Sequence, residues 1–253
     1  MKTGTVTALV SLLAAAVGCD GFLGPGHGRV QRVDDVSFPD SVRALYAEDA
    51  ARLAVRHLQA TESPARGDVE LPGSLLLGLT SALARVHNAT ELPARDSVIA
   101  VYRIHTFPRP EVQYLIVGLD PEAPWISSWS GGQRLTGDER VDSLVLQWDL
   151  TVDHYYTFSW GHTAVLRSSK PLNMFALGTR FETIEGVLDT HPYRWCCDGD
   201  DITAHAAADA WILEYSIGRG DCMAGCAHRC WTFLVAADGT VRFLTAGPCE
   251  SSR

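Results

Sequence analysis

Hydrophobic residues recur every three or four positions in the first part of the chain, which predicts amphipathic helices. The first such pattern predicts a helix over residues 40–59. Its apolar positions are Val42, Leu45, Leu53, Ala54 and Leu58. Asp49, Arg52 and Arg56 fall between these positions and are expected on the solvent side. A second run, rich in Leu and Ala, predicts a helix over residues 74–87.

The next segments change to a pattern that is typical of strands. Residues 97–106 and 111–119 are rich in β-branched and aromatic residues, and Pro108 and Pro110 lie between them. Because proline cannot donate a backbone hydrogen bond to a sheet, the two prolines mark a connection, and the segments are expected to form a hairpin. Residues 125–132 are expected to form a loop.

The rest of the chain is increasingly strand-like. The expected elements are a helix from about residue 138, a strand over 154–160, a helix over 171–184, and strands over 211–216, 229–235 and 240–245. Asp238 and Gly239 separate the last two strands and predict a tight antiparallel hairpin. The sequence therefore predicts an α+β fold in which N-terminal helices pack on a mainly antiparallel sheet that ends in a C-terminal β-hairpin.

Length and composition favour one acidic globular domain over residues 37–253. The 253 residues are 46% hydrophobic, which is enough to bury a substantial core. The formal net charge of −9 repels phosphate backbones and anionic lipid headgroups. Nucleic-acid binding and electrostatic docking on a membrane are therefore not expected.

Residues 1–18 have the parts of a secretory signal. Lys2 precedes an apolar run over residues 6–17, and Cys19 follows small residues directly. The apolar run is too short to span a bilayer. This arrangement resembles the signal peptide of bacterial lipoproteins, although Ala16 stands where Leu is usual in that motif. An ordinary signal peptide, cut nearby without lipidation of Cys19, is the alternative.

The lipoprotein resemblance implies a location. Cys19 would carry the lipid, and residues 19–36, which are rich in glycine, would form a flexible tether to the domain. The protein would be exported to the bacterial cell envelope and contact the membrane through this lipid. Asp20 resembles an inner-membrane retention signal, but either the inner or the outer membrane remains open.

Removing Cys19 leaves an even number of cysteines in an exported chain, which favours disulfides. The candidates are Cys196, Cys197, Cys222, Cys226, Cys230 and Cys249. Cys230 has Cys249, Cys196 and Cys197 as possible partners. The equal spacing of Cys222, Cys226 and Cys230 leaves a zinc or iron–sulfur ligand set, which would include His228 in the case of zinc, and reactive thiols as alternatives.

The segment around Cys222 contains three glycines and two cysteines within residues 218–226. It resembles a GDCxxGC-like loop found in exported bacterial proteins of uncharacterised function, with three residues between the cysteines here. The resemblance covers only residues 208–247 and implies no activity.

An acidic turn at Asp198, Asp200 and Asp201 is a candidate calcium site, because hard cations need several converging oxygens. The turn lacks the full EF-hand spacing, and a solvated acidic loop is the alternative. Asp221 would strengthen the calcium hypothesis if it lay beside this turn.

Catalytic motifs are weak. Asp149, Asp153, His154 and His162 cluster in sequence, and an oriented His154 would serve as a general base. A hydrolase would need two or more residues of a set of six, these four together with Asp198 and Asp221, to converge in a pocket. His105 and Arg103 are expected on the polar face of a strand.

Aromatic residues crowd the middle of the chain: Trp125, Trp129, Trp148, Tyr155, Tyr156 and Trp160. They either fill the core, which is the interpretation favoured here, or supply stacking surfaces for a protein or carbohydrate ligand. The sequence as a whole favours a non-catalytic binding or interaction domain without a cofactor. A periplasmic hydrolase and a calcium-stabilised structural domain are the alternatives.

Overall fold

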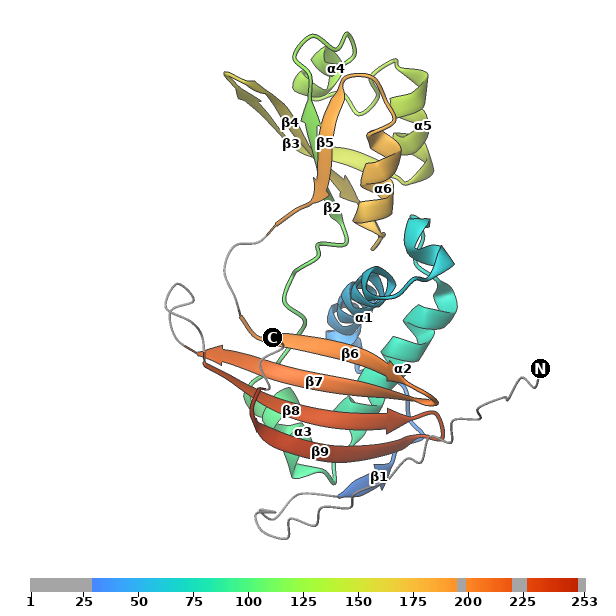
Figure 1. Ribbon diagram of the computed structural model, residues 1–253, viewed down its shortest axis with the longest axis vertical. Coiled ribbons are helices and arrows are strands. Elements are labelled where there is room, and N and C mark those ends of the chain that lie inside the picture. The colour runs from blue at the N-terminus through green and yellow to red at the C-terminus, as the bar shows by residue number, and fades with distance from the viewer. Residues whose placement is uncertain (1–28, 195–198, 220–226, 250–253) are drawn as a thin grey trace, which may run out of the picture.

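The computed structural model describes residues 29–194, 199–219 and 227–249. These residues form six α-helices and two antiparallel sheets, so the predicted α+β class is confirmed. The two sheets belong to two lobes, which lie one above the other in Figure 1.

The lower lobe contains a five-stranded sheet with the strand order β1-β9-β8-β7-β6. Its strands are β1 (Val30–Arg32), β6 (Asp201–Ala207), β7 (Ala210–Arg219), β8 (Ala227–Ala236) and β9 (Thr240–Pro248). Its helices are α1 (Asp40–Ala60), α2 (Gly73–Asn88) and α3 (Pro93–Asp96), with a 3₁₀ turn η1 (Pro64–Gly67) and a π-helical turn η2 (Ser97–Val101). The two long helices cover one face of this sheet (Figure 1).

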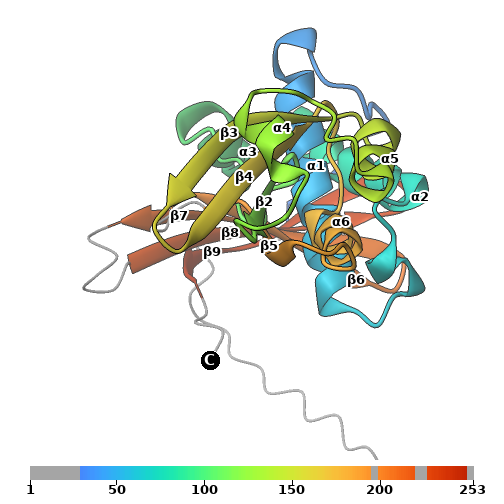
Figure 2. The same cartoon turned by 90° about the horizontal axis from the view of Figure 1, so that it is seen from above.

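The upper lobe is inserted into the lower one between η2 and β6. Its sheet has the order β3-β4-β2-β5 and consists of β2 (Tyr114–Leu119), β3 (Leu150–Phe158), β4 (Gly161–Ser168) and β5 (Val187–Pro192). Its helices are α4 (Ile126–Ser130), α5 (Glu139–Gln147) and α6 (Met174–Phe181). Figure 2 shows the β3–β4 hairpin extending away from α5 and α6.

Each lobe has its own cluster of buried hydrophobic side chains. In the lower lobe Leu53 and Leu83 of the helices pack with Tyr215 and Phe233 of the sheet. In the upper lobe the cluster lies between the sheet and the helices, and its members include Leu115, Leu166, Trp129 and Phe181. Trp125 and Trp129 are buried, as the core interpretation of the aromatic residues predicts.

The predicted C-terminal hairpin is confirmed. Gly239 has a φ of 93°, which a side chain would disfavour, and the Asp238 carboxylate accepts a hydrogen bond from the Thr240 backbone N–H at 2.9 Å. β8 and β9 pair on either side of this turn. The helices expected over residues 40–59 and 74–87 are also present, as α1 and α2.

The strand predicted over residues 97–106 is wrong. This segment begins with the π-helical turn and continues as an irregular connection, while Val98 and Ile104 are fully buried in the lower core. Burial in the lower core therefore overrides the β-propensity of its Val and Ile residues, because propensity is a weak preference. The loop predicted over residues 125–132 likewise contains the short helix α4.

The tether predicted over residues 19–36 is wrong at its C-terminal end. Val30–Arg32 form β1, which pairs antiparallel with β9, and Val33 beyond it is buried. The glycine-rich composition concealed this strand because its pairing partner lies more than 200 residues later in the chain. The first part of the predicted tether, residues 19–28, lies outside the described residues.

A buried asparagine joins the lobes. Asn173 of the upper lobe is fully buried, and its side-chain amide donates hydrogen bonds to the carbonyls of Arg66 at 3.0 Å and Asp68 at 3.1 Å. Its backbone N–H donates to the carbonyl of Val69 at 2.9 Å, and Val69 itself packs in the upper core. The loop after η1 is thus fixed to the start of α6.

Replacing Asn173 with alanine should loosen this contact. We expect Asn173→Ala to lower the free energy of unfolding by about 1–3 kcal/mol, because two partly buried carbonyls lose their donors. Amide hydrogen exchange over residues 64–72 should accelerate. Thr179→Ala, on the exposed side of the same helix, is the control and should change stability by less than about 0.5 kcal/mol. Equal stability of the two variants would contradict the proposed role of Asn173.

Candidate functional site

The predicted acidic turn leads into an ion pair at the boundary between the lobes. The Asp201 carboxylate accepts hydrogen bonds from the guanidinium of Arg56 at 2.9 Å and from the backbone N–H groups of Phe107 at 2.7 Å and Ile202 at 2.8 Å. Burial raises the pKa of Asp201, although Arg56 and the N–H donors oppose this effect.

Arg56 also binds backbone carbonyls. Its guanidinium donates to the carbonyl oxygens of Ile202 at 2.7 Å, Phe107 at 2.9 Å and Arg109 at 2.7 Å. Arg56 was expected on the solvent side of its helix, but its side chain is only 22% exposed. Arg56 therefore holds two segments in place. One is the connection that leads into the upper lobe, and the other is the start of β6, where the chain returns to the lower lobe.

The calcium hypothesis stays a prediction. Asp198 and Asp221 lie outside the described residues, while Asp201 already has the partners given above. Within the described ranges, no three His, Cys, Asp or Glu side chains come together as a metal-ligand set.

A buried acid pairs with a histidine in the lower lobe. Asp49 is 1% exposed, and its carboxylate lies 2.6 Å from Nδ1 of His105. The same carboxylate accepts hydrogen bonds from the backbone N–H of Thr106 at 2.8 Å and from its hydroxyl at 2.7 Å. Arg52, which is also buried, donates to the Thr106 hydroxyl at 3.3 Å.

The positions expected for this group are wrong, because Asp49 and Arg52 were expected in solvent and His105 on a strand. A usable signal was present: Asp49 lies three residues after Tyr46 and four before Leu53, both of which are buried on α1. In the described part of the chain, no Ser or Cys side chain hydrogen-bonds to His105. Asp49 orients His105 as an aspartate orients a catalytic general base, but the described residues supply no nucleophile for such a base to activate. The contacts of Asp49 instead hold residues 105–106 against α1.

Burial has an electrostatic consequence beside this pair. Desolvation raises the pKa of both Tyr46 and Tyr215, and the negative charge of Asp49 adds to the effect. The two phenols therefore stay protonated throughout the physiological pH range.

The predicted catalytic cluster is not brought together. Asp149 pairs with Arg134 at 2.7 Å, and hydrogen bonds from Ser169 and Arg134 lower its pKa. Asp153 and His154 are in contact with each other at 3.3 Å. His154 pairs with Val165, which lies three positions from His162 along β4, so the two histidines lie on opposite faces of the hairpin.

An aromatic row runs along the exposed face of β3. His154, Tyr156, Phe158 and Trp160 alternate in sequence, and their neighbouring ring centroids lie 6.0, 6.2 and 4.8 Å apart. Tyr156 is 46% exposed, Phe158 43% and Trp160 74%. We call these four residues the aromatic stripe. The core interpretation of Tyr156 and Trp160 is therefore wrong, because the hairpin extends beyond the helices that cover the rest of the sheet.

The strand that carries the stripe is an edge strand. Among the described residues β3 pairs only with β4, so its other side has no strand partner. Residues 154–166, which span the stripe and the return strand, include no Asp, Glu, Lys or Arg. Natural edge strands are usually protected by charged residues, proline or bulges. In β3 these features are confined to Asp153 and the register shift beside it, and the segment that carries the stripe has none.

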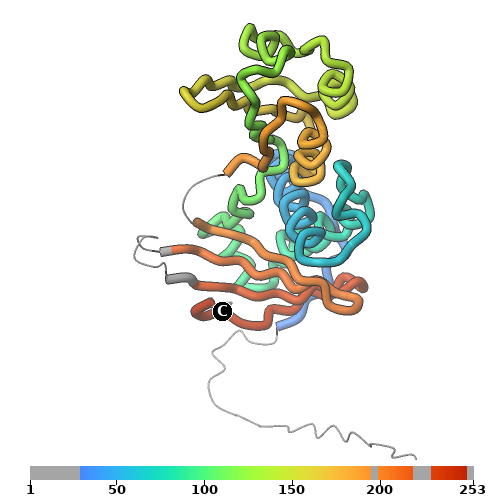
Figure 3. Tube along the Cα trace, turned by 45° about the horizontal axis from the view of Figure 1, so that its top comes forward, coloured from blue at the N-terminus to red at the C-terminus, as the bar shows by residue number. Residues whose placement is uncertain are grey.

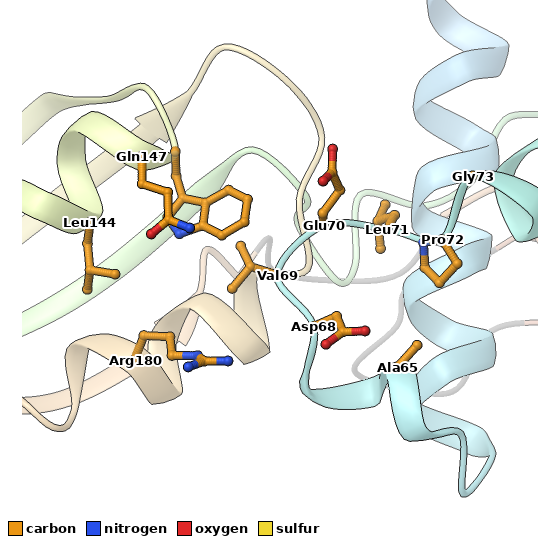
Figure 4. A pocket seen from close by; sticks show the side chains of 11 residues that line it. Ala65, Asp68, Val69, Glu70, Leu71, Pro72, Gly73, Leu144, Gln147 and Arg180 are labelled. Atoms are coloured by element: carbon orange, nitrogen blue, oxygen red, sulfur yellow. The ribbon is translucent and has the colours of Figure 1, made fainter.

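A groove of about 670 Å³ lies between the lobes. Its lower-lobe wall is the segment from Ala65 to Gly73, which includes Asp68 and Glu70, and its upper-lobe wall includes Leu144, Trp148 and Arg180. Figure 4 shows these side chains from close by, with Arg180 extending toward the loop that carries Asp68. Of these residues, only Trp148 belongs to the aromatic group that was expected either in the core or at a ligand.

The cysteine prediction is confirmed for one pair. Cys230 and Cys249 form a disulfide with Cα atoms 5.0 Å apart, which ties β8 to the end of β9. Cys19, Cys196, Cys197, Cys222 and Cys226 lie outside the described residues, as does most of the glycine-rich loop.

Comparisons give no family. The chain matches no protein-family model, no curated protein and no solved structure. Among the described residues, none of the helices has both the length and the hydropathy to cross a bilayer.

Removing Arg56 should destabilise the protein in a pH-dependent way. Arg56→Ala leaves Asp201 without its cation, so we expect a loss of roughly 2–3 kcal/mol near pH 7. The pKa of Asp201, already raised by burial, should rise further. When the pKa of a carboxyl group is higher in the folded protein than in the unfolded chain, protonation of that group stabilises the folded state. The loss of stability in Arg56→Ala should therefore shrink as the pH falls toward about 4.

Urea unfolding followed by circular dichroism across this pH range would measure the effect. In the double variant Arg56→Ala/Asp201→Asn the loss should no longer vary with pH, since the titrating group is gone. A loss in Arg56→Ala that is constant with pH would show that Asp201 is not the group left unpaired.

Proposed function

We propose that the protein is a lipid-anchored interaction protein of the bacterial envelope, which binds an extended polypeptide segment along the edge strand β3. The observation that carries the proposal is the exposed aromatic stripe on an edge strand without a strand partner in the described chain. An added strand would receive main-chain hydrogen bonds from β3 and side-chain contacts from the stripe.

Three properties favour a polypeptide with an uncharged strand. The edge offers backbone donors and acceptors, which alternate along a strand as another strand requires. The hairpin has no acidic or basic residue over 154–166, so an apolar partner would not leave a charge buried and unpaired. Burying the exposed parts of three aromatic rings supplies hydrophobic stabilisation at the same place.

The arrangement of the rings favours a polypeptide over a carbohydrate. The planes of Phe158 and Trp160 are inclined by only 3° at a centroid distance of 4.8 Å, so each ring covers a face of the other. Tyr156 and Phe158 are also stacked, with an angle of 26°. Stacking with a sugar needs open ring faces, and the mutual stacking of these rings covers part of the faces that a sugar would use.

The proposed anchor and the stripe belong to different lobes. Cys19 would carry the lipid, and β1, the first described strand after it, lies in the lower lobe. The β3–β4 hairpin extends from the upper lobe (Figure 1). An anchor that joins the lower lobe to the membrane would leave the stripe available to a partner in the envelope.

Lipidation can be tested by intact-mass analysis of the mature protein. We expect cleavage before Cys19 and an added acyl lipid, with both lost in Cys19→Ala. Measuring the mass before and after reduction would also count the disulfides, since each gains two hydrogens. A mature chain without added lipid would contradict the anchor, although not the binding surface.

Strand addition at β3 can be tested by amide hydrogen exchange. Exchange over residues 153–158 should be slower in envelope membranes than in the purified protein, because a bound strand protects the amides of the edge. The double variant Tyr156→Lys/Phe158→Lys should lose this protection, and its melting temperature should change little because both positions are exposed. Leu77→Lys, at a residue of α2 that is 68% exposed, is the control and should keep it.

A photo-cross-linker at Phe158 would identify the bound molecule. We expect at least tenfold more adduct from this position than from Leu77, and the adduct should be a polypeptide. Adducts with the protein's own mass would identify a second copy as the partner. Equal exchange of β3 in membranes and in solution, or adducts with glycan alone, would contradict strand addition.

A further inference from the structure

The groove between the lobes has charges of both signs that do not neutralise one another. Asp68 and Arg180 both line it and both are exposed. Among the described residues, neither side chain takes part in an ion pair within 4.0 Å. Glu70, the other acid in the groove, is 3.3 Å from Lys170 and is therefore compensated. One anion and one cation are left on opposite walls.

The walls belong to different lobes, so the lobe contact sets their separation. Asp68 is in the loop after η1, and its own backbone carbonyl accepts a hydrogen bond from the buried Asn173 at 3.1 Å. Arg180 lies in the last turn of α6, the helix that begins after Asn173. In Figure 4 the Arg180 side chain extends across the groove toward this loop.

The rest of the groove is apolar with one amide. Trp148 and Leu144 form a hydrophobic wall on the upper lobe, and Leu71 and Pro72 lie on the other side. Gln147 adds a side-chain amide that can donate and accept hydrogen bonds. The volume of about 670 Å³ is that of a small-molecule site, and sites between lobes are common.

We infer that this groove binds a short zwitterionic peptide with an apolar side chain. The carboxylate of the peptide would pair with the guanidinium of Arg180, whose fork matches a carboxylate in two parallel hydrogen bonds. Its ammonium group would pair with Asp68, and its apolar side chain would pack on Trp148 and Leu144. Because the charged groups are exposed, the affinity is modest, with a Kd of about 0.01–1 mM. This inference does not rest on the function proposed for β3.

The test uses the mature protein and three forms of one probe, measured by isothermal titration calorimetry. The probes are the tripeptide Leu-Gly-Gly, its N-acetylated form and its C-terminal amide. We expect saturable binding of the free tripeptide and at least fivefold weaker binding of each blocked form, because each block removes one of the two charges.

Two variants assign the charges to their partners. Asp68→Asn should weaken binding of the free tripeptide at least fivefold. In this variant N-acetylation should have no further effect on binding, whereas C-terminal amidation should still weaken it. Arg180→Gln should show the reverse pattern. Glu62→Gln and Arg242→Gln change exposed charges outside the groove and should behave as the unmodified protein. Circular dichroism would verify that each variant is folded.

The inference is overturned if no probe binds saturably, or if blocking the termini has the same effect in both variants as in the unmodified protein. The variant Tyr156→Lys/Phe158→Lys separates the two proposals, because it should lose protection of β3 and keep tripeptide binding.

Discussion

Arg56 is the constraint on which the relation between the lobes depends. The upper lobe is attached to the lower one by two covalent connections, one of which enters it through residues 102–113 and is seen as the green tube between the lobes in Figure 3. The other returns to β6. Arg56 binds carbonyls in the first connection and the ion-pair partner Asp201 at the start of β6, so one guanidinium holds both beside α1. Its cost of desolvation is offset by several charge-assisted hydrogen bonds.

Asn173 performs a similar task with a neutral group. Both are polar side chains whose partners are mainly backbone carbonyls, and the carbonyls of Asp68, Phe107 and Arg109 belong to segments without regular secondary structure. Backbone N–H and C=O groups in irregular segments near a core have no partners within a helix or sheet, so side chains must supply their hydrogen bonds. The position of the groove follows from these contacts, because they place the loop after η1 opposite α6.

Local sequence patterns predicted much of the secondary structure but little of the candidate sites. The helices α1 and α2 and the terminal hairpin were predictable because helix periodicity and turn residues act within a few positions. The strands β4, β5 and β6 were not foreseen, and residues 97–106 were assigned to a strand although they form a π-helical turn and an irregular connection in the lower core. The burial of Asp49 depends on Thr106, which is 57 residues away.

The sites show the same limit. The strand that carries the aromatic stripe was expected over residues 154–160, but its exposure depends on the order of strands in the sheet, which a local pattern does not reveal. The groove combines residues from three separated segments, and only Trp148 had attracted notice as an aromatic residue. For the disulfide, the sequence left three partners for Cys230, and pairing with Cys249 depends on the register of β8 and β9.

The pairing of β1 with β9 sets an order of assembly. The sheet of the upper lobe is complete once residue 192 is available, and its cluster takes only Val69 from outside the insertion. The sheet of the lower lobe needs the first described strand and the last one, which are joined only when the whole chain is present. Contacts between such distant segments form slowly because a long loop must close. In a chain that emerges from its N-terminus, the inserted lobe can therefore fold while the host lobe waits for its final strand.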